Sequence, residues 1–133
     1  MAIQWTEELA TGIERIDAQH RDLYAQVASL HQAMRTSELD RVPAVLDGLQ
    51  RYALEHFATE EREMAARAYP RLAQHRVLHR TFVDEFLRHR ALLSDGVTLS
   101  GVVGLSVWLT DWLREHVRKE DGQLAEFIRG EKR

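Results

Sequence analysis

Apolar residues recur at alternating spacings of three and four in four separate stretches of the chain. This spacing keeps the apolar side chains on one stripe of a helix, and such stripes are typical of helices that pack nearly antiparallel in a bundle. The alternation of apolar and polar residues that indicates a β-strand is absent from the sequence. The four stripes run over residues 13–34, 42–56, 72–93 and 102–116.

Short turn-forming segments separate the four stripes. Residues 36–41 are polar and lead into Pro43, which the first turn of a helix tolerates. Tyr69-Pro70 and Ser94-Asp95-Gly96 form the two later breaks. Connections this short force neighbouring helices to run antiparallel.

We therefore predict an all-α fold, an up-down-up-down antiparallel four-helix bundle, in a single domain that covers residues 1–133. The bundle is expected over about residues 13–121. Residues 1–12 are expected to form an N-terminal arm that packs onto the bundle. Apolar residues recur once more within residues 122–133, where they predict a short C-terminal helix.

The chain has 133 residues, no cysteine and a formal net charge of −3. A chain of this length can bury a core without disulfides, and the lack of cysteine fits a reducing compartment and excludes thiolate metal ligands. The charge gives no reason to expect nucleic acid or an anionic membrane as a partner. No apolar run approaches the ~20 residues of a membrane span, and the N-terminus lacks the features of a signal peptide. We therefore expect a soluble, cytoplasmic protein.

Five of the seven histidines interrupt the apolar stripes, and they do so in an ordered way. His20 lies early in the first predicted helix, and His75 and His79 lie early in the third. His56 lies late in the second helix and His116 lies late in the fourth. In an up-down-up-down bundle these positions fall at the same end, so the five imidazoles are predicted to meet in one layer of the core.

Burial of five imidazoles in one layer is costly unless something satisfies their inward nitrogens. An unsatisfied buried polar group costs on the order of 1–3 kcal/mol, whereas a whole domain is stable by only ~5–15 kcal/mol. A bundle that binds metal is therefore favoured over a bundle that does not. His31 and His89 lie late in odd-numbered helices, at the opposite end, and are expected to be structural or surface residues.

Carboxylates at helical spacing from these histidines supply further candidate ligands. Glu60 is four residues from His56, so both side chains point into the same layer, and His75 and His79 have the same relation. Glu61 is five residues from His56, about 140° around a helix. We expect it to be a solvated charge that faces away from the site.

The fourth helix offers two candidate carboxylates, and spacing does not decide between them. Glu120 is four residues from His116 and fits a regular helix. Asp121 is five residues away, but Gly122 indicates that the helix ends there, and a widened last turn would swing Asp121 inward. Five imidazoles and two carboxylates exceed the needs of one ion, so we predict two ions that share bridging carboxylates. Iron, zinc, copper and nickel all suit such ligands.

The histidines and carboxylates belong to a series of short motifs. These are Ile16-Asp17-Ala18-Gln19-His20, His56-Phe57-Ala58-Thr59-Glu60-Glu61, Tyr69-Pro70, His75-x3-His79 with Phe82, and Asp111-Trp112-Leu113-x2-His116-x4-Asp121. Each motif is weak alone, but their combination resembles the hemerythrins, more closely the single-domain bacterial kind, over nearly the whole chain. Because myohemerythrin is a standard example of an up-down-up-down bundle, the resemblance and the fold prediction are not independent.

The resemblance implies two non-haem iron ions, bridged by a hydroxide or oxide, that take dioxygen as their ligand. It also favours Asp121 over Glu120 as the carboxylate ligand from the fourth helix. The implied ligands are His75, His79 and His116 for one iron, His20 and His56 for the other, and Glu60 and Asp121 as bridges. The second iron would keep an open position, where dioxygen binds and leaves unchanged. The protein would then carry, store or supply oxygen and would not be an enzyme.

The surroundings of the ligands can also be predicted. Reversible oxygen binding needs a dry pocket, and ligating imidazoles usually donate their outer N–H group to an acceptor. Asp17, Gln19, Asp111 and backbone carbonyls are candidates for such acceptors. The proposed apolar wall of the pocket, which would also serve as ordinary core, consists of Leu23, Leu109, Trp112 and Leu113.

Two other functions fit the same motifs. The protein could report oxygen or redox state to a partner protein, which the sequence does not identify. It could also be an enzyme with an open diiron site, such as a peroxidase or a nitric oxide reductase. The Glu-x-x-His motif of ferritin-like oxidases and the His-Glu-x-x-His motif of zinc proteases are both absent.

Overall fold

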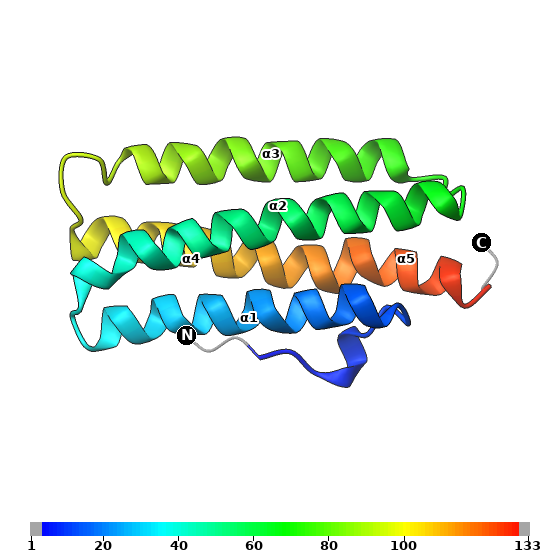
Figure 1. Cartoon of the computed structure of the whole chain (residues 1–133), viewed down its shortest axis with the longest axis horizontal. Coiled ribbons are helices and arrows are strands. Elements are labelled where there is room, and N and C mark those ends of the chain that lie inside the picture. The colour runs from blue at the N-terminus through cyan, green and yellow to red at the C-terminus, as the bar shows by residue number, and fades with distance from the viewer. Residues whose placement is uncertain (1–3, 131–133) are drawn as a thin grey trace.

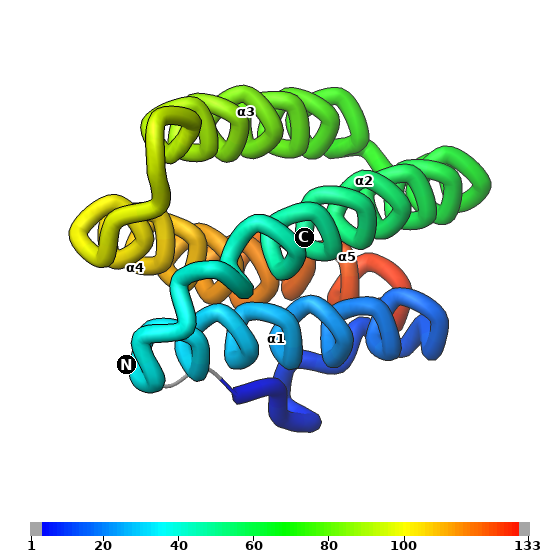
Figure 2. The backbone as a smooth tube through the Cα atoms, turned by 60° about the vertical axis from the view of Figure 1, so that its left-hand side comes forward, coloured from blue at the N-terminus to red at the C-terminus, as the bar shows by residue number. Residues whose placement is uncertain are grey.

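The computed structural model describes residues 4–130, and within that range the chain is helical with no strand. The four long helices are α1 (Glu14–Arg35), α2 (Val42–Ala66), α3 (Leu72–Ala91) and α4 (Leu99–Glu115). Each packs against the next, α4 packs back against α1, and their directions alternate (Figure 1). In Figure 2, α1 and α3 lie at opposite edges of the bundle with α2 and α4 between them. The predicted up-down-up-down bundle is confirmed.

The fourth helix continues further than the sequence suggested. After α4 the backbone widens into a π-helical segment, η3 (His116–Glu120), and then resumes as α5 (Asp121–Ile128). The predicted end of the helix at Gly122 is therefore wrong, because this glycine lies in the first turn of α5. The expected short C-terminal helix is nevertheless present and prolongs the bundle beyond the start of α1 (Figure 1).

The connections follow the predicted breaks. A short 3-10 helix, η2 (Leu39–Arg41), joins α1 to α2, and Pro43 lies in the first turn of α2. Residues 67–71 join α2 to α3, and residues 92–98 join α3 to α4. The Thr98 hydroxyl accepts a hydrogen bond from Gly101 N at 3.1 Å and so caps α4.

The N-terminal arm is anchored at both of its described ends. It includes a 3-10 helix, η1 (Glu7–Leu9), and the side chains of Trp5 and Leu9 pack against the core. Asp17 in the first turn of α1 accepts hydrogen bonds from Thr11 N at 2.8 Å and from Thr11 Oγ1 at 2.9 Å. Residues 1–3 of the predicted arm and residues 131–133 at the other terminus lie outside the described range.

Two apolar clusters enclose the layer that contains the histidines. The larger cluster fills most of the bundle. The smaller one contains Ile16, Met64, Tyr69 and Leu124, all 5% exposed or less. The first two are one helical turn from His20 and Glu60, on the side of the nearer bundle end, and α5 contributes Leu124. The polar layer therefore lies in a dry part of the core.

None of the helices within residues 4–130 combines the length and the apolar character that a membrane span requires.

Candidate metal centre

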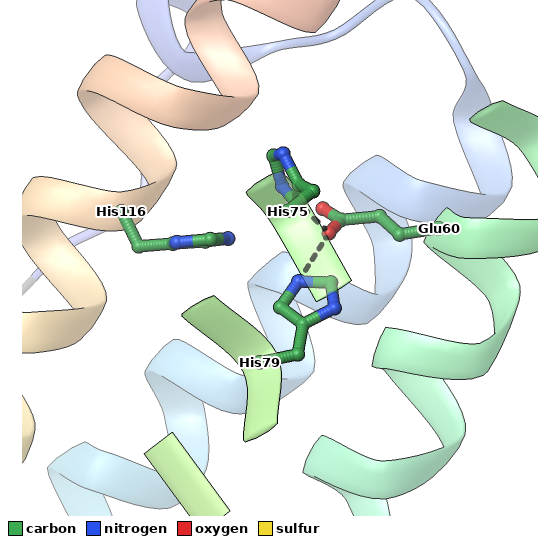
Figure 3. Close-up of side chains that lie close together, drawn as sticks. All are labelled: Glu60, His75, His79 and His116. Atoms are coloured by element: carbon green, nitrogen blue, oxygen red, sulfur yellow. Dashed lines mark ion pairs between the residues drawn. The ribbon is translucent and has the colours of Figure 1, made fainter. Parts of the chain in front are cut away.

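The structure brings all seven predicted ligand side chains together in one buried layer. They come from α1, α2, α3, the π-helical segment η3 and the start of α5, and none is more than 5% exposed. In Figure 3, His75 and His79 of α3 and His116, the first residue of η3, point toward Glu60 of α2. The complete set is His20, His56, Glu60, His75, His79, His116 and Asp121.

Glu60 lies between two groups of histidines, with one oxygen toward each. Its Oε2 is 3.3 Å from His20 Nε2 and 3.1 Å from His56 Nε2. Its Oε1 is 3.4 Å from His75 Nε2 and 3.1 Å from His79 Nε2. The carboxylate is therefore oriented to bridge two positions about which the histidines gather.

Asp121 divides its oxygens in the same way. Its Oδ2 is 3.0 Å from His20 Nε2, on one side. On the other side, its Oδ1 is 2.9 Å from His75 Nε2 and 3.4 Å from His116 Nε2. The two carboxylates thus separate a group of two histidines from a group of three.

The π-helical segment explains why Asp121 faces the site and Glu120 does not. The Asp121 backbone N–H donates to the His116 carbonyl, five residues earlier, as in a π-helix. This wider turn places residues five apart on one face, whereas an ordinary turn would do so for residues four apart. Glu120 instead points outward, where its Oε1 lies 3.4 Å from Nη2 of Arg71.

The histidines and carboxylates of the layer shift one another's pKa values strongly. Burial alone would lower the pKa of His20 and His75, but Asp121 and Glu60 raise the pKa of His20 to about 10 and that of His75 to about 9. Burial opposes ionisation of the two carboxyls, yet the neighbouring histidines hold the pKa of each below its ordinary value. At His56 burial prevails and lowers the pKa. Without metal the layer therefore holds protons that a cation must displace.

The hydrogen-bond geometry of the layer suits metal ions better than protons. Although the nitrogen–oxygen distances are short, many of the facing atoms make no directed hydrogen bond. Ions bound about 2.1 Å from each ligand atom would hold neighbouring ligands at right angles about 3.0 Å apart, close to these distances. Two overlapping groups have ligand atoms within 4.8 Å of one another, so the layer can accommodate two cations. The buried atoms of the layer that make no hydrogen bond are Nδ1 and Nε2 of His20, Nε2 of His56, His79 and His116, both Glu60 oxygens and Asp121 Oδ2.

Two of the imidazoles, those of His56 and His79, have an acceptor for their outer nitrogen. His56 Nδ1 lies 2.9 Å from Oε1 of Gln19, one of the candidate acceptors. Of the other candidate side chains, Asp17 accepts hydrogen bonds from Thr11 in the N-terminal arm, and Asp111 is exposed.

Glu61 was expected to face away from the site as a solvated charge, and this expectation is also wrong. Its Oε2 lies 2.8 Å from Nδ1 of His79 on the neighbouring helix. The spacing to His56 correctly excludes a place among the inward ligands. The spacing could not reveal the contact of Glu61 with α3, because that contact depends on how α2 and α3 pack.

A small apolar cavity adjoins the histidine layer. His20, His56 and His116 lie at its edge, and the cavity has a volume of about 20 Å³. That is room for about one very small molecule. All four predicted wall residues line the cavity, together with six further apolar residues. The apolar lining comprises Leu23, Val27, Leu49, Ala53, Phe57, Phe82, Leu109, Trp112, Leu113 and Val117.

The two remaining histidines lie away from this layer, as predicted. His31 is buried in the other half of the bundle, with its Nε2 3.2 Å from Oγ1 of Thr110. His89 is partly exposed and stacks on Trp108, with ring centroids 5.0 Å apart. Both have structural roles.

Comparison with known proteins agrees with this geometry. Residues 11–128 match the family model described as the hemerythrin HHE cation binding domain. Bacteriohemerythrin from Stenotrophomonas maltophilia (strain R551-3) is 31% identical over 125 residues, which cover 94% of this chain and 80% of that protein. Bacteriohemerythrin from Methylococcus capsulatus is 28% identical, with 88% and 89% covered, and myohemerythrin from Theromyzon tessulatum is 24% identical, with 89% and 87% covered. The chain, with its layer of five histidines and two carboxylates, belongs to the hemerythrin family.

Proposed function

We propose that this protein binds dioxygen reversibly at two non-haem iron ions and acts in the cytoplasm as an oxygen carrier, store or supplier. The observation that carries the proposal is the apolar cavity, whose edge includes both members of the two-histidine group, His20 and His56, but only His116 of the other three. An ion held by the two-histidine group has fewer protein ligands than its neighbour, so a small molecule in the cavity can reach it. The names bacteriohemerythrin and myohemerythrin of the similar proteins agree with this role.

The seven side chains have distinct roles in this proposal. Each carboxylate would hold both ions, because its two oxygens face the two groups of histidines. With both ions ferrous, the pair supplies the electrons that dioxygen binding requires. The ligands of the first iron would be His75, His79 and His116, those of the second would be His20 and His56, and the bridges would be Glu60 and Asp121.

The cavity wall keeps water from the bound oxygen. Leu23, Leu109 and Leu113 present only hydrocarbon to the cavity and are 5% exposed or less. Trp112 stacks on the imidazole of His116 with ring centroids 4.4 Å apart and an interplanar angle of 10°, which fixes the plane of that ring. Exclusion of water protects the bound state from irreversible oxidation, so the wall favours release of oxygen over turnover.

The visible absorption spectrum of the iron-loaded, reduced protein tests this function directly. We expect a colourless sample that gains a charge-transfer band when oxygen is added and loses it when oxygen is removed. Repeated cycles should return the same amplitude. A variant with a polar side chain in the cavity wall, Leu109→Gln, should lose the band faster because water reaches the site.

Rapid conversion to a ferric spectrum without a stable oxygen adduct would contradict reversible binding. It would instead favour a redox sensor that acts through a partner protein, or a diiron enzyme. Turnover with peroxide or nitric oxide would then distinguish a peroxidase or a nitric oxide reductase from a sensor.

A further inference from the structure

The imidazole of His79 has a carboxylate beside each of its two nitrogens, and the two carboxylates belong to consecutive residues. Its inner nitrogen, Nε2, lies 3.1 Å from Oε1 of Glu60. Its outer nitrogen, Nδ1, lies 2.8 Å from Oε2 of Glu61, the next residue of α2. Because Nδ1–H donates to Glu61, Nε2 carries no proton in the neutral ring and presents its lone pair to the site.

Further contacts fix both members of this pair. The ring of Phe57 stacks on His79 with centroids 3.9 Å apart and an interplanar angle of 9°. The other oxygen of Glu61, Oε1, lies 3.4 Å from Nε of Arg76 on α3. Glu61 is only 26% exposed at the side chain and lines a groove between α2 and α3, with Arg80 on the same groove. The carboxylate is thus positioned by its surroundings and is not a freely solvated charge.

The other half of the layer has a neutral acceptor at the matching place. His56 Nδ1 lies 2.9 Å from Oε1 of Gln19, which is an amide oxygen. The amide nitrogen of Gln19 donates to Thr59 Oγ1 at 3.2 Å, and Thr59 Oγ1 in turn donates to the Glu55 carbonyl at 3.0 Å. This chain of hydrogen bonds fixes which end of the amide faces the imidazole.

We propose that Glu61 is a positioning residue that makes the two metal sites electronically unequal. This inference rests on the proposed diiron function. A carboxylate acceptor draws the Nδ1 proton more strongly than an amide does, so His79 becomes a stronger electron donor than His56. The iron bound by the three histidines is therefore stabilised in its ferric form relative to the iron that faces the cavity.

A reciprocal exchange of the two acceptors tests this inference. Glu61→Gln keeps an acceptor of similar size and removes its charge, whereas Gln19→Glu adds a charge beside His56. We expect the reduction potential of the iron pair to rise in Glu61→Gln and to fall in Gln19→Glu. Glu63→Gln, which removes another carboxylate of α2, one that pairs with Arg67, should leave the potential unchanged. An unchanged potential in Glu61→Gln, or equal shifts in Glu61→Gln and Glu63→Gln, would overturn the inference.

Zinc binding gives a second readout that does not depend on oxygen chemistry. Mutation of an outer hydrogen-bond partner typically weakens metal affinity about 10–100-fold, so Glu61→Gln, which loses the charge of that partner, should bind zinc more weakly within this range at one of two sites. In the zinc-loaded wild type, the Nδ1–H proton of His79 should appear strongly downfield in the ¹H NMR spectrum and move upfield in Glu61→Gln. If wild type and Glu61→Gln bind two zinc ions equally well, the inference fails while the metal centre stands. If the wild type binds no metal, both fail.

Discussion

Each half of the bundle buries histidine, but in opposite chemical settings. His31 lies in the apolar half, beside the hydroxyl of Thr110, and burial lowers its pKa. His20 lies in the other half, where burial would have the same effect. There, however, Asp121 and Glu60 outweigh burial and raise its pKa to about 10. The same residue type is therefore favoured as a neutral ring at one place and as a cation, or a metal ligand, at the other.

This difference shows what distinguishes a structural histidine from a metal-binding one. A single imidazole can be satisfied by one hydroxyl, since both groups are uncharged and one hydrogen bond suffices. Five imidazoles around two shared carboxylates leave inward atoms without partners, as at Nε2 of His56, His79 and His116. In the apolar half the imidazole of His31 has a partner, whereas the facing atoms of the polar half are arranged as the ligands of cations would be.

The largest expected effect is on iron content, and it should differ between two adjacent carboxylates, Asp121 and Glu120. Asp121→Ala should reduce bound iron from two ions to one or none, because a bridge that faces His20, His75 and His116 is lost. Glu120→Ala should retain both ions, since its side chain lies outside the layer beside Arg71. Iron-to-protein ratios of the purified variants measure this. Full iron content in Asp121→Ala would show that the π-helical segment does not position a ligand.

A smaller effect is expected when the metal-free protein is taken from near pH 6.5 to near pH 9. The pKa values of His20 and His75 are raised from 6.5 to about 10 and about 9 on folding, so both bind protons more tightly in the folded state. Their contribution to stability is complete below pH 6.5 and is lost as the pH rises through these values. Denaturant titrations should therefore show a fall in the free energy of unfolding by a few kcal/mol.

His31 provides the control for this pH dependence. Because burial lowers its pKa, His31 binds no more protons in the folded than in the unfolded state, so it does not contribute to this fall in stability. A His31→Asn variant should lose stability between near pH 6.5 and near pH 9 as the wild type does, whereas His20→Asn should lose less. A smaller loss in His31→Asn than in His20→Asn would mean that the protons are held in the apolar half of the bundle.

The smallest effect is expected in the apolar half. Thr110→Val removes the hydroxyl that pairs with His31 and keeps the size of the side chain. One hydrogen bond contributes about 1 kcal/mol, so the free energy of unfolding should fall by roughly that amount. Metal content should not change. A loss of iron in Thr110→Val would show that the two halves are coupled more closely than their contacts suggest.

The sequence alone was sufficient for the fold and for the location of the site. Apolar periodicity predicted four helices with the observed breaks, because burial of one face per helix imposes a local rule that the sequence must follow. The order of His20, His56, His75, His79 and His116 predicted one layer, since alternating helix directions convert position along a helix into height in the bundle. Spacing of four also identified Glu60.

Where the chain departs from a regular helix, or where two helices meet, the tertiary structure decided the outcome. Asp121 and Glu120 could not be separated by spacing, because the choice depends on a π-helical segment with no distinct sequence pattern. Glu61 was misassigned because its partner, His79, lies on another helix at a distance set by the packing of α2 against α3. Local periodicity specifies which face of a helix is buried, whereas contacts across the bundle depend on the packing of all its helices at once.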